Sequence, residues 1–457
     1  MHKKLTSIIL CISLVVILLV TIGCKTTTTG NTTTSSTPTT TAVTTTNTTT
    51  TSVSTTAATT TATTAAAGTK TDFEGINYVP YTGRWDGKFE YPLIIPLSGS
   101  AAAYGIANMR AVQYASDHLN GQGGVVVDGK HYKITPVFWD SKYQAADVAT
   151  LTDRAVSLGY KYMSLMGQAL TLTMYQKTVA NNIFFIANAL PNHAFINTSC
   201  PLIFDSTLGT SDLGPATYYP EFVKEFGVKN MVLVDPDNDS GRLYSGVCQQ
   251  VIKDYGLPMT VISDQYYTPG TQDFSPLVNK IMSLHPDMVD CPGAVAGDFA
   301  LFMKQLGEAG FKGVRCESVS LVDPTVGWQI AGSYSTGCFN IGFAGMDPSP
   351  LYTTAQAQYV KDYGEKPFSG FFYYYELTCY YLCKAITQSN SFDPYRVAAT
   401  LQDMTWSGMY GSGSKFIGDD PGSPWGLKRI WIVQQPMSQW TTNGNATVWK
   451  NVAPITR

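Results

Sequence analysis

The sequence predicts an α/β protein built from two doubly wound lobes. From residue 91 onward, short apolar segments alternate with segments whose apolar residues recur at helical spacing. This order is typical of parallel sheets with helices on both faces. The alternation runs through two successive units of about 120 residues, each long enough for one lobe. Ligands of such sheets bind outside the carboxyl ends of the strands, so we expect a site in the cleft between the lobes.

The first unit begins with an apolar strand, the turn Ser98-Gly99-Ser100 and a helix that stops at glycines 121–124. The other elements follow from the same changes between strand and helix periodicity. The predicted strands are 92–97, 132–139, 162–166 and 183–187, and the predicted helices are 102–120, 145–158 and 172–180.

The second unit repeats this order. Its predicted helices are 213–226, 241–255, 274–284 and 297–309, and its predicted strands are 230–234, 259–266 and 288–291. The aromatic-rich segment 371–381 is interpreted as a further helix, which either packs in the core or lines the cleft.

The N-terminus resembles the signal of a bacterial lipoprotein. Lys3 and Lys4 precede an uncharged apolar stretch that ends at residue 23, and Gly23-Cys24 looks like a lipobox, although Thr21 stands where that motif usually has Leu. We therefore expect 1–23 to be removed and Cys24 to be acylated. The alternative is an uncleaved anchor, because about 20 apolar residues can span a bilayer. Both interpretations place the body at the extracytoplasmic face of the cell membrane, in the periplasm or on the outer surface.

Residues 24–71 are predicted to form a disordered tether behind the lipidated cysteine. Between 26 and 69, 26 of 44 residues are Thr and none is charged. Such a composition cannot bury enough apolar surface to offset the entropy of ordering. The segment is interpreted as a spacer with hydroxyls available for O-glycosylation, or as neutral low-complexity sequence.

Composition and motifs exclude several classes of function. The net charge is −3 and no basic run occurs, so no nucleic-acid partner is expected. No nucleophile elbow, P-loop or metal-ligand spacing is visible, so we expect no catalytic residue, no metal, no cofactor and no enzymatic activity. Seven cysteines lie in the body, and Cys291 and Cys316 are the best candidates for a disulfide because they follow neighbouring predicted strands.

Six segments, in this order and spacing, resemble the leucine/isoleucine/valine-type (branched-chain amino acid) substrate-binding proteins of ABC transporters, which are type I periplasmic binding proteins. They are IPLSGSAAAYG at 95–105, ASDHLNGQGG at 115–124, FWDSKYQAA at 138–146, DFSPL at 273–277, QLGEAG at 305–310 and IAGSYSTG at 330–337. The resemblance covers residues 91 to 435. It implies two Rossmann-like lobes joined by three crossovers. The implied division is 72–206 plus 340–415 for lobe 1 and 207–339 plus 416–457 for lobe 2.

The resemblance also implies a ligand pocket, carried over by position from the turns of both lobes. Its residues are Ser98, Tyr104, Gln168, Ala169, Thr171, Asn188, Ala189, Leu190, Ser240, Ala294 and Glu317. Thr171 and Glu317 fit the groups with which the family's amino-acid binders hold an α-amino acid. Leu190 stands where those binders have Thr, and Ser240 and Ala294 stand where they often have Tyr. We therefore expect a small polar or amphipathic solute, an amino acid or a related compound, and not necessarily a standard α-amino acid.

The implied function is solute binding by a monomeric lipoprotein of an ABC importer, which closes on its ligand and then docks on a membrane permease. A ligand-sensing receptor of the same fold, signalling to a membrane partner, is the alternative. An exported hydrolase has little support, because no nucleophile–base pair is present.

Overall fold

The computed structural model describes residues 68–71, 77–206, 209–320, 322–341, 350–367, 374–409, 411–421, 423, 425–431 and 437–450. All of them belong to one compact unit, Thr64–Arg457. The predicted signal 1–23, the lipidation site Cys24 and the tether up to residue 67 lie outside the described residues. Among those described, no helix is both long enough and apolar enough to cross a membrane.

Lobe 1 is built on a nine-stranded sheet. Its strands are β3 (Gly87–Ile95), β4 (Val125–Val127), β5 (Lys130–Asp140), β6 (Tyr162–Met166), β7 (Phe184–Asn188), β8 (Ile203–Asp205), β14 (Thr405–Gly408), β15 (Gly411–Ile417) and β16 (Ile430–Trp431). Their order is β14-β15-β16-β8-β7-β6-β3-β5-β4. The run from β16 to β5 is parallel, and the edge strands pair antiparallel. The short strands β1 (Lys70–Thr71) and β2 (Asn77–Tyr78) form a separate antiparallel pair.

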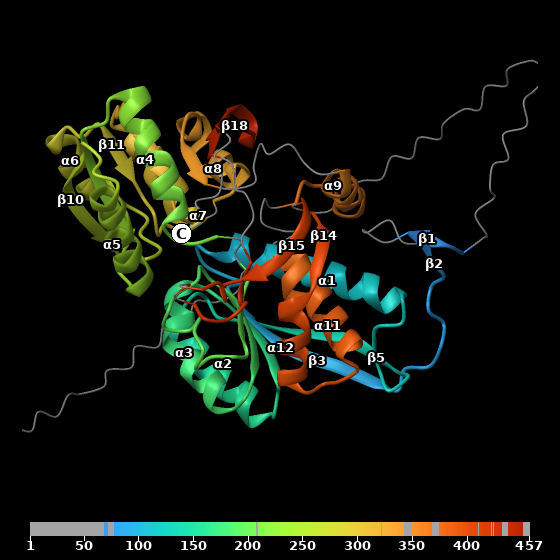
Figure 1. Ribbon diagram of the computed structural model, residues 1–457. Helices are drawn as coiled ribbons and strands as arrows, with labels where there is room; N and C mark the ends of the chain where they lie inside the picture. Colours follow the sequence, from blue (N-terminus) through green and yellow to red (C-terminus); the bar gives the residue numbers. More distant parts are fainter. Residues whose placement is uncertain are drawn as a thin grey trace, which may run out of the picture. The chain divides into compact units, whose positions relative to one another are not determined.

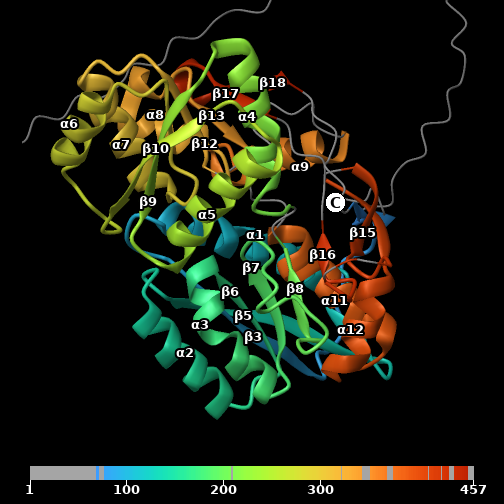
Figure 2. The ribbon, with the colours of Figure 1, turned by 60° about the vertical axis from the view of Figure 1, so that its left-hand side comes forward.

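Helices cover both faces of this sheet. They are α1 (Ala102–Gly121), α2 (Ala145–Ser157), α3 (Gln168–Ala180), α9 (Pro350–Tyr363), a π-helix at Tyr374–Tyr380, α11 (Tyr381–Ser389) and α12 (Pro394–Asp403). Figure 2 shows α2 and α3 on one face, with α11 and α12 on the other. Separate buried clusters fill the two interfaces, so the strands are apolar on both sides, as the predicted parallel sheet requires.

Lobe 2 repeats the plan with a seven-stranded sheet. Its strands are β9 (Asn230–Pro236), β10 (Thr260–Tyr267), β11 (Met288–Asp290), β12 (Val314–Glu317), β13 (Phe339–Ile341), β17 (Met437–Trp440) and β18 (Ala446–Lys450). The order is β10-β9-β11-β12-β13-β17-β18, parallel through β13 and antiparallel beyond it. The helices are α4 (Leu213–Phe226), α5 (Asp239–Asp254), α6 (Ser275–Leu284), α7 (Ala296–Glu308) and α8 (Pro324–Ala331), with 3-10 turns at Gly332–Ser335 and Thr442–Gly444. Figure 1 shows these helices around the sheet.

The described strands confirm the predicted α/β class and its three passages between two sheets. The passages follow β8, β13 and β16. The last one lies further along the chain than the implied boundary at 416, because Ile430 of β16 pairs with Asp205 of β8 in lobe 1. The second passage also lies slightly later than the implied boundary at residue 340. Phe339 and Asn340 of β13 still pair with β12 in lobe 2.

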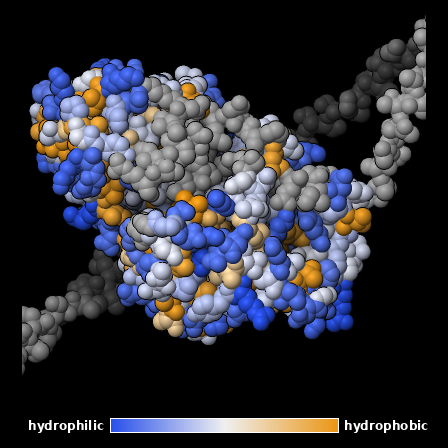
Figure 3. All heavy atoms as spheres, in the orientation of Figure 1, coloured by the Kyte–Doolittle hydropathy of each residue, from blue (hydrophilic) through white to orange (hydrophobic). Residues whose placement is uncertain are grey.

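The elements predicted between 91 and 309 are confirmed, with ends that shift by at most five residues. The aromatic-rich segment begins outside the described residues and continues as the π-helix and α11. On the face that Figure 3 presents, hydrophobic residues form small groups among hydrophilic ones.

The expected Cys291–Cys316 disulfide is wrong. Both residues are free, buried thiols, as are the other five described cysteines. Cys316 pairs in register with Asp290, so Cys291 is one residue further along its strand. Because side chains alternate along a strand, the two thiols lie in the separate clusters on opposite faces of the sheet.

Candidate ligand-binding cavity

A cavity of about 110 Å³ lies where the carboxyl ends of both sheets meet. Its wall comes from turns after strands of lobe 1 and lobe 2 and from the first residues of the helices that follow. This is the position that doubly wound sheets offer to ligands. Among the described lining residues, tyrosines and small residues predominate and none is charged.

Seven of the eleven residues implied by the resemblance line this cavity. They are Tyr104, Gln168, Asn188, Ala189, Leu190, Ser240 and Ala294. Ala169 is next to the wall, and its backbone N–H donates to the Ser240 hydroxyl at 2.7 Å. This bond joins α3 of lobe 1 to α5 of lobe 2.

Gly167 places the start of α3 beside the cavity. Its φ of +115° lies in a region that L side chains rarely adopt. A Cβ at this position would also lie 2.7 Å from the Tyr143 ring. Glycine therefore allows β6 to turn directly into α3 while Tyr143 packs over the turn.

Gln168 lines the cavity with a side chain that is only 3% exposed. Among the described residues, neither its amide oxygen nor its amide nitrogen has a hydrogen-bond partner. A buried amide without a hydrogen-bond partner destabilises the folded protein. A ligand with a matching polar group would remove this cost by pairing with the amide.

Asn188 has a different role, although it also lines the cavity. Its amide donates to the Ser164 hydroxyl and accepts from the Ser206 and Thr378 hydroxyls, at 2.8 and 3.1 Å for the last two. These bonds tie the end of β7 to β6 and the π-helix. They position Ala189 and Leu190 rather than presenting an amide to a ligand.

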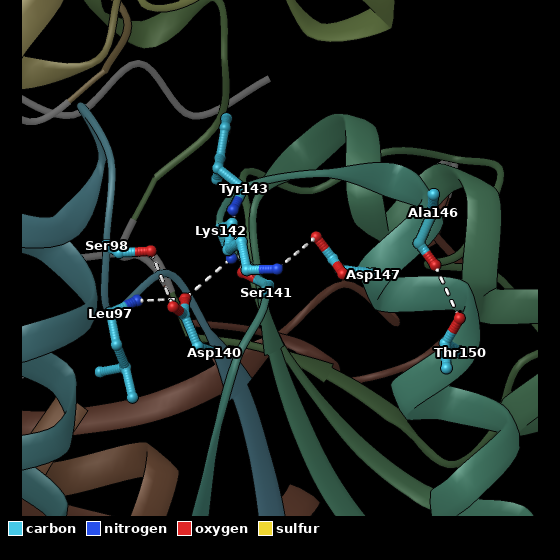
Figure 4. A network of polar contacts seen from close by, with 9 residues as sticks. All are labelled: Leu97, Ser98, Asp140, Ser141, Lys142, Tyr143, Ala146, Asp147 and Thr150. Carbon is cyan, nitrogen blue, oxygen red and sulfur yellow. Dashed lines mark hydrogen bonds and ion pairs between the residues drawn. The ribbon is translucent and has the colours of Figure 1, made fainter. Parts of the chain in front are cut away.

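Ser98 does not line the cavity, and its hydroxyl donates to Asp140 at 2.7 Å (Figure 4). The other Asp140 oxygen accepts from the backbone N–H groups of Leu97 and Lys142, both at 2.8 Å. Lys142 and Tyr143 have positive φ angles of 48° and 58°. Asp140 thus stabilises a strained turn, from which Tyr143 extends away from the sheet and lines the cavity.

Thr171 and Glu317 do not line the cavity. Thr171 is fully buried in α3. Glu317 is fully buried at the end of β12, where its two carboxyl oxygens accept from Ser320 N–H at 2.5 Å and from the Asn340 amide at 2.7 Å. Ser320 is itself part of the wall, so Glu317 lies directly behind it.

Two further carboxyl groups end the neighbouring strands of lobe 2. Asp235 of β9 accepts from Gly293 N–H at 2.7 Å, and Asp290 of β11 accepts from the hydroxyls of Tyr219 and Ser318 at 2.5 and 2.6 Å. Burial raises the pKa of Asp290 to about 6, although these hydroxyl hydrogen bonds act in the opposite direction. Burial likewise raises the pKa of Asp235 and that of Glu317 well above their usual values.

Two tyrosines of the wall were missed by sequence reasoning: Tyr143 and Tyr244. Tyr143 follows a predicted strand within the 138–146 segment, and Tyr244 comes one helical turn after Ser240, so both had a usable signal. Tyr374 belongs to the aromatic-rich segment 371–381, for which the sequence left core packing and cleft lining open, and the structure shows both for this residue. The described residues contain no group of three or more His, Cys, Asp or Glu that could hold a metal ion.

A sequence profile of the periplasmic binding protein family matches residues 92–424. The chain belongs to this family. The match spans most of both lobes, and the predicted resemblance is thereby confirmed. Proteins of this family act outside the cytoplasm. No curated relative with significant sequence similarity was found.

Solved structures of this fold agree. The chain is 17% identical to the branched-chain amino acid transporter substrate-binding protein LivJ from Streptococcus pneumoniae in complex with isoleucine, with a TM-score of 0.66 over 80% of this chain and 100% of that one. It is 18% identical to the leucine-binding protein LivK from Thermotoga maritima, with a TM-score of 0.65 over 80% and 99%. It is 16% identical to an ABC transporter solute-binding protein from R. palustris in complex with benzoate, with a TM-score of 0.68 over 80% and 97%. At these identities the likeness establishes the two-lobed type I fold.

Proposed function

We propose that this protein is an extracytoplasmic solute-binding lipoprotein of an ABC importer. The observation that carries the proposal is the cavity between the two sets of strand ends, beside which the Ala169–Ser240 hydrogen bond joins the two lobes. A solute held there contacts both lobes at once, so it stabilises the closed arrangement over the open one. The closed form then docks on a permease. The mechanism is binding without chemistry.

The proposed ligand is a small polar or amphipathic solute. Relatives of the same fold hold isoleucine and benzoate, which supports an organic solute of this size. We assign direct contacts to Tyr104, Gln168 and Ser240, with Ala189, Leu190 and Ala294 forming the apolar wall. Ala169 and Asn188 keep this wall in place, Ser98 acts through Asp140, and Thr171 and Glu317 support it from behind. Both Glu317 oxygens already have partners, which favours a ligand other than a standard α-amino acid.

We further propose that Cys24 is acylated after removal of 1–23 and that 24–71 is a spacer. The test is palmitate labelling in cells. We expect incorporation into the wild-type protein and none into Cys24→Ala. Equal labelling of both would overturn the lipid anchor.

The solute-binding role is tested by a thermal-shift screen against amino acids, amides, amines, aromatic acids and short peptides, followed by calorimetry. We expect one class to stabilise the protein and to stimulate ATP hydrolysis by its permease complex in proteoliposomes. Stabilisation without any stimulation would overturn the transport role and favour the sensing receptor. If no compound stabilises the protein, solute binding itself is overturned.

A further inference from the structure

We propose that the cavity selects organic cations, ammonium or amidinium compounds with an apolar or aromatic part, and disfavours carboxylates. This inference rests on the proposed function and narrows its ligand class. It is carried by the wall of the cavity and by the groups immediately behind that wall.

Four tyrosines dominate the wall: Tyr104, Tyr143, Tyr244 and Tyr374. Tyrosine faces attract ammonium and amidinium groups, and they pack equally well on apolar parts of a ligand. The described lining contains no Lys or Arg that could balance a carboxylate. Lys142 precedes the lining residue Tyr143, and Arg242 lies between Ser240 and Tyr244 in sequence. Their side chains are more than half exposed and pair with Asp147 and Asp237.

Buried carboxyl groups lie behind the wall of lobe 2. Asp235 and Glu317 accept hydrogen bonds from the backbone N–H groups of Gly293 and Ser320, which are both lining residues. Asp290 ends the strand between theirs. Their hydrogen-bond partners in the described structure are N–H, hydroxyl and amide groups, and none is Lys or Arg.

These carboxyl groups couple electrostatically to the cavity. The pKa of Tyr104 is raised well above its usual value, first by burial and then by its interaction with Glu317. The pKa of Tyr244 is raised in the same way, by burial and by nearby groups that include Tyr143, Glu317 and Asp235. A cation at the tyrosines favours ionisation of the carboxyl groups, whereas an anion there opposes it, so the wall discriminates by the sign of the ligand's charge.

The Gln168 amide is an independent indication of a ligand. It is 3% exposed and faces the cavity from lobe 1, and its oxygen has no partner among the residues that the structure describes. That oxygen can accept an N–H from an ammonium or amidinium group. The second oxygen of Asp235 is also buried and has no partner among the described residues. A cationic donor between the lobes thus meets an amide oxygen from lobe 1 and carboxyl groups behind the wall of lobe 2.

The test is calorimetric titration of the full-length protein with two matched series. One compares benzylammonium, benzyl alcohol and benzoate, and the other compares leucinamide with leucine. We expect benzylammonium to bind at least tenfold more tightly than benzyl alcohol and benzoate, and leucinamide at least tenfold more tightly than leucine. Equal or tighter binding of the alcohol, benzoate or leucine would overturn the cation preference and leave solute binding intact. If none of the five compounds binds, the cation preference is overturned, and the wider screen decides the proposed function separately.

The variants Asp235→Asn and Glu317→Gln test the source of the preference. Each replaces a carboxyl group that can ionise by a neutral amide of nearly the same shape. We expect either variant to weaken the binding of benzylammonium about tenfold and to leave the affinity for benzyl alcohol unchanged. If one variant fails to fold, the other still decides, and an unchanged ratio between the two ligands would overturn the role of the buried carboxyl groups.

Discussion

Asp290 shows how lobe 2 accommodates a carboxyl group that has no cationic partner in the described part of the chain. It is fully buried, and hydroxyl groups of Tyr219 and Ser318 together with the Ser318 N–H satisfy its oxygens. These bonds support the ionised form, but desolvation outweighs them, so the pKa rises from 3.8 to about 6. The proton is therefore held more tightly in the folded chain than in the unfolded one.

A dependence of stability on pH follows from this shift. The contribution of Asp290 is fully present below pH 3.8 and is lost as the pH rises toward 6, by up to about 3 kcal/mol. We expect Asp290→Asn to lack this loss. Urea unfolding of both proteins from pH 4 to 7 measures it. Parallel curves for the two proteins would show that another group is responsible.

Arg429 is the corresponding buried cation of lobe 1. Its guanidinium group donates to the Pro201 carbonyl at 2.9 and 2.7 Å and to Gln402 at 2.7 Å, and it lies 4.3 Å from the centre of the Phe204 ring. Burial lowers its pKa to about 10. The planar guanidinium group, a fork of donors, thus joins the β8 region to α12 through carbonyl and amide oxygens.

Replacing this fork by an ammonium group leaves carbonyls unpaired. We expect Arg429→Lys to lower the free energy of unfolding by about 2–3 kcal/mol. The matched control is Lys428→Arg, because Lys428 is next in sequence and its exposed ammonium pairs with Asp403. Thermal unfolding should separate the two variants, and equal melting temperatures would contradict the role of the buried fork.

At the scale of elements, the helices that flank the cavity are fixed by close backbone approaches. A Cβ on Gly105 of α1 would lie 1.7 Å from the Pro96 carbonyl oxygen. No side chain can be moved aside to relieve this clash, because the obstacle is backbone. Gly105 therefore sets how closely α1 lies against the turn after β3.

A paired substitution tests this packing. We expect Gly105→Ala to destabilise the protein by about 3 kcal/mol. Gly246→Ala, in α5, has open space around the new Cβ and should stabilise it by about 0.5–1 kcal/mol through helix propensity. Both values come from denaturant unfolding. A neutral Gly105→Ala would show that α1 can shift without cost.

Elements were more predictable from the sequence than side-chain roles. Periodicity located strand β6 and helix α4 without error, because an apolar pattern records which residues face the core. It could not tell that Ser98 turns to Asp140, or that Glu317 bonds behind the wall, since a position after a strand does not determine the direction of a side chain. The pairing of β16 was missed because two residues carry too little pattern.

At the scale of the whole molecule, the two lobes share the cavity and meet at the Ala169–Ser240 bond. If the closed arrangement is the one that holds solute, losing this bond shifts the equilibrium toward opening. The Ser240 hydroxyl therefore contributes to affinity in two ways, through the relation between the lobes and through its assigned contact with the solute.

We therefore expect Ser240→Ala to weaken the binding of the solute found in the screen about three- to tenfold, without lowering the melting temperature of the free protein. The control is Ser245→Ala, on the same helix, whose hydroxyl bonds Asp264 at 2.7 Å within lobe 2. That variant should lower the melting temperature and leave affinity unchanged, as measured by calorimetry and thermal unfolding. If Ser240→Ala instead lowered the melting temperature and left affinity unchanged, the Ala169–Ser240 bond would not stabilise the closed arrangement.

The seven free, buried thiols have a practical consequence for observing such movement. Because the described cysteines are shielded from solvent, maleimide dyes should react slowly with them while the protein is folded. A pair of cysteines introduced at exposed positions on α2 and α6 would then carry the fluorophores almost alone. Energy transfer between the dyes could follow opening and closing in single molecules, without first removing a native cysteine from either core.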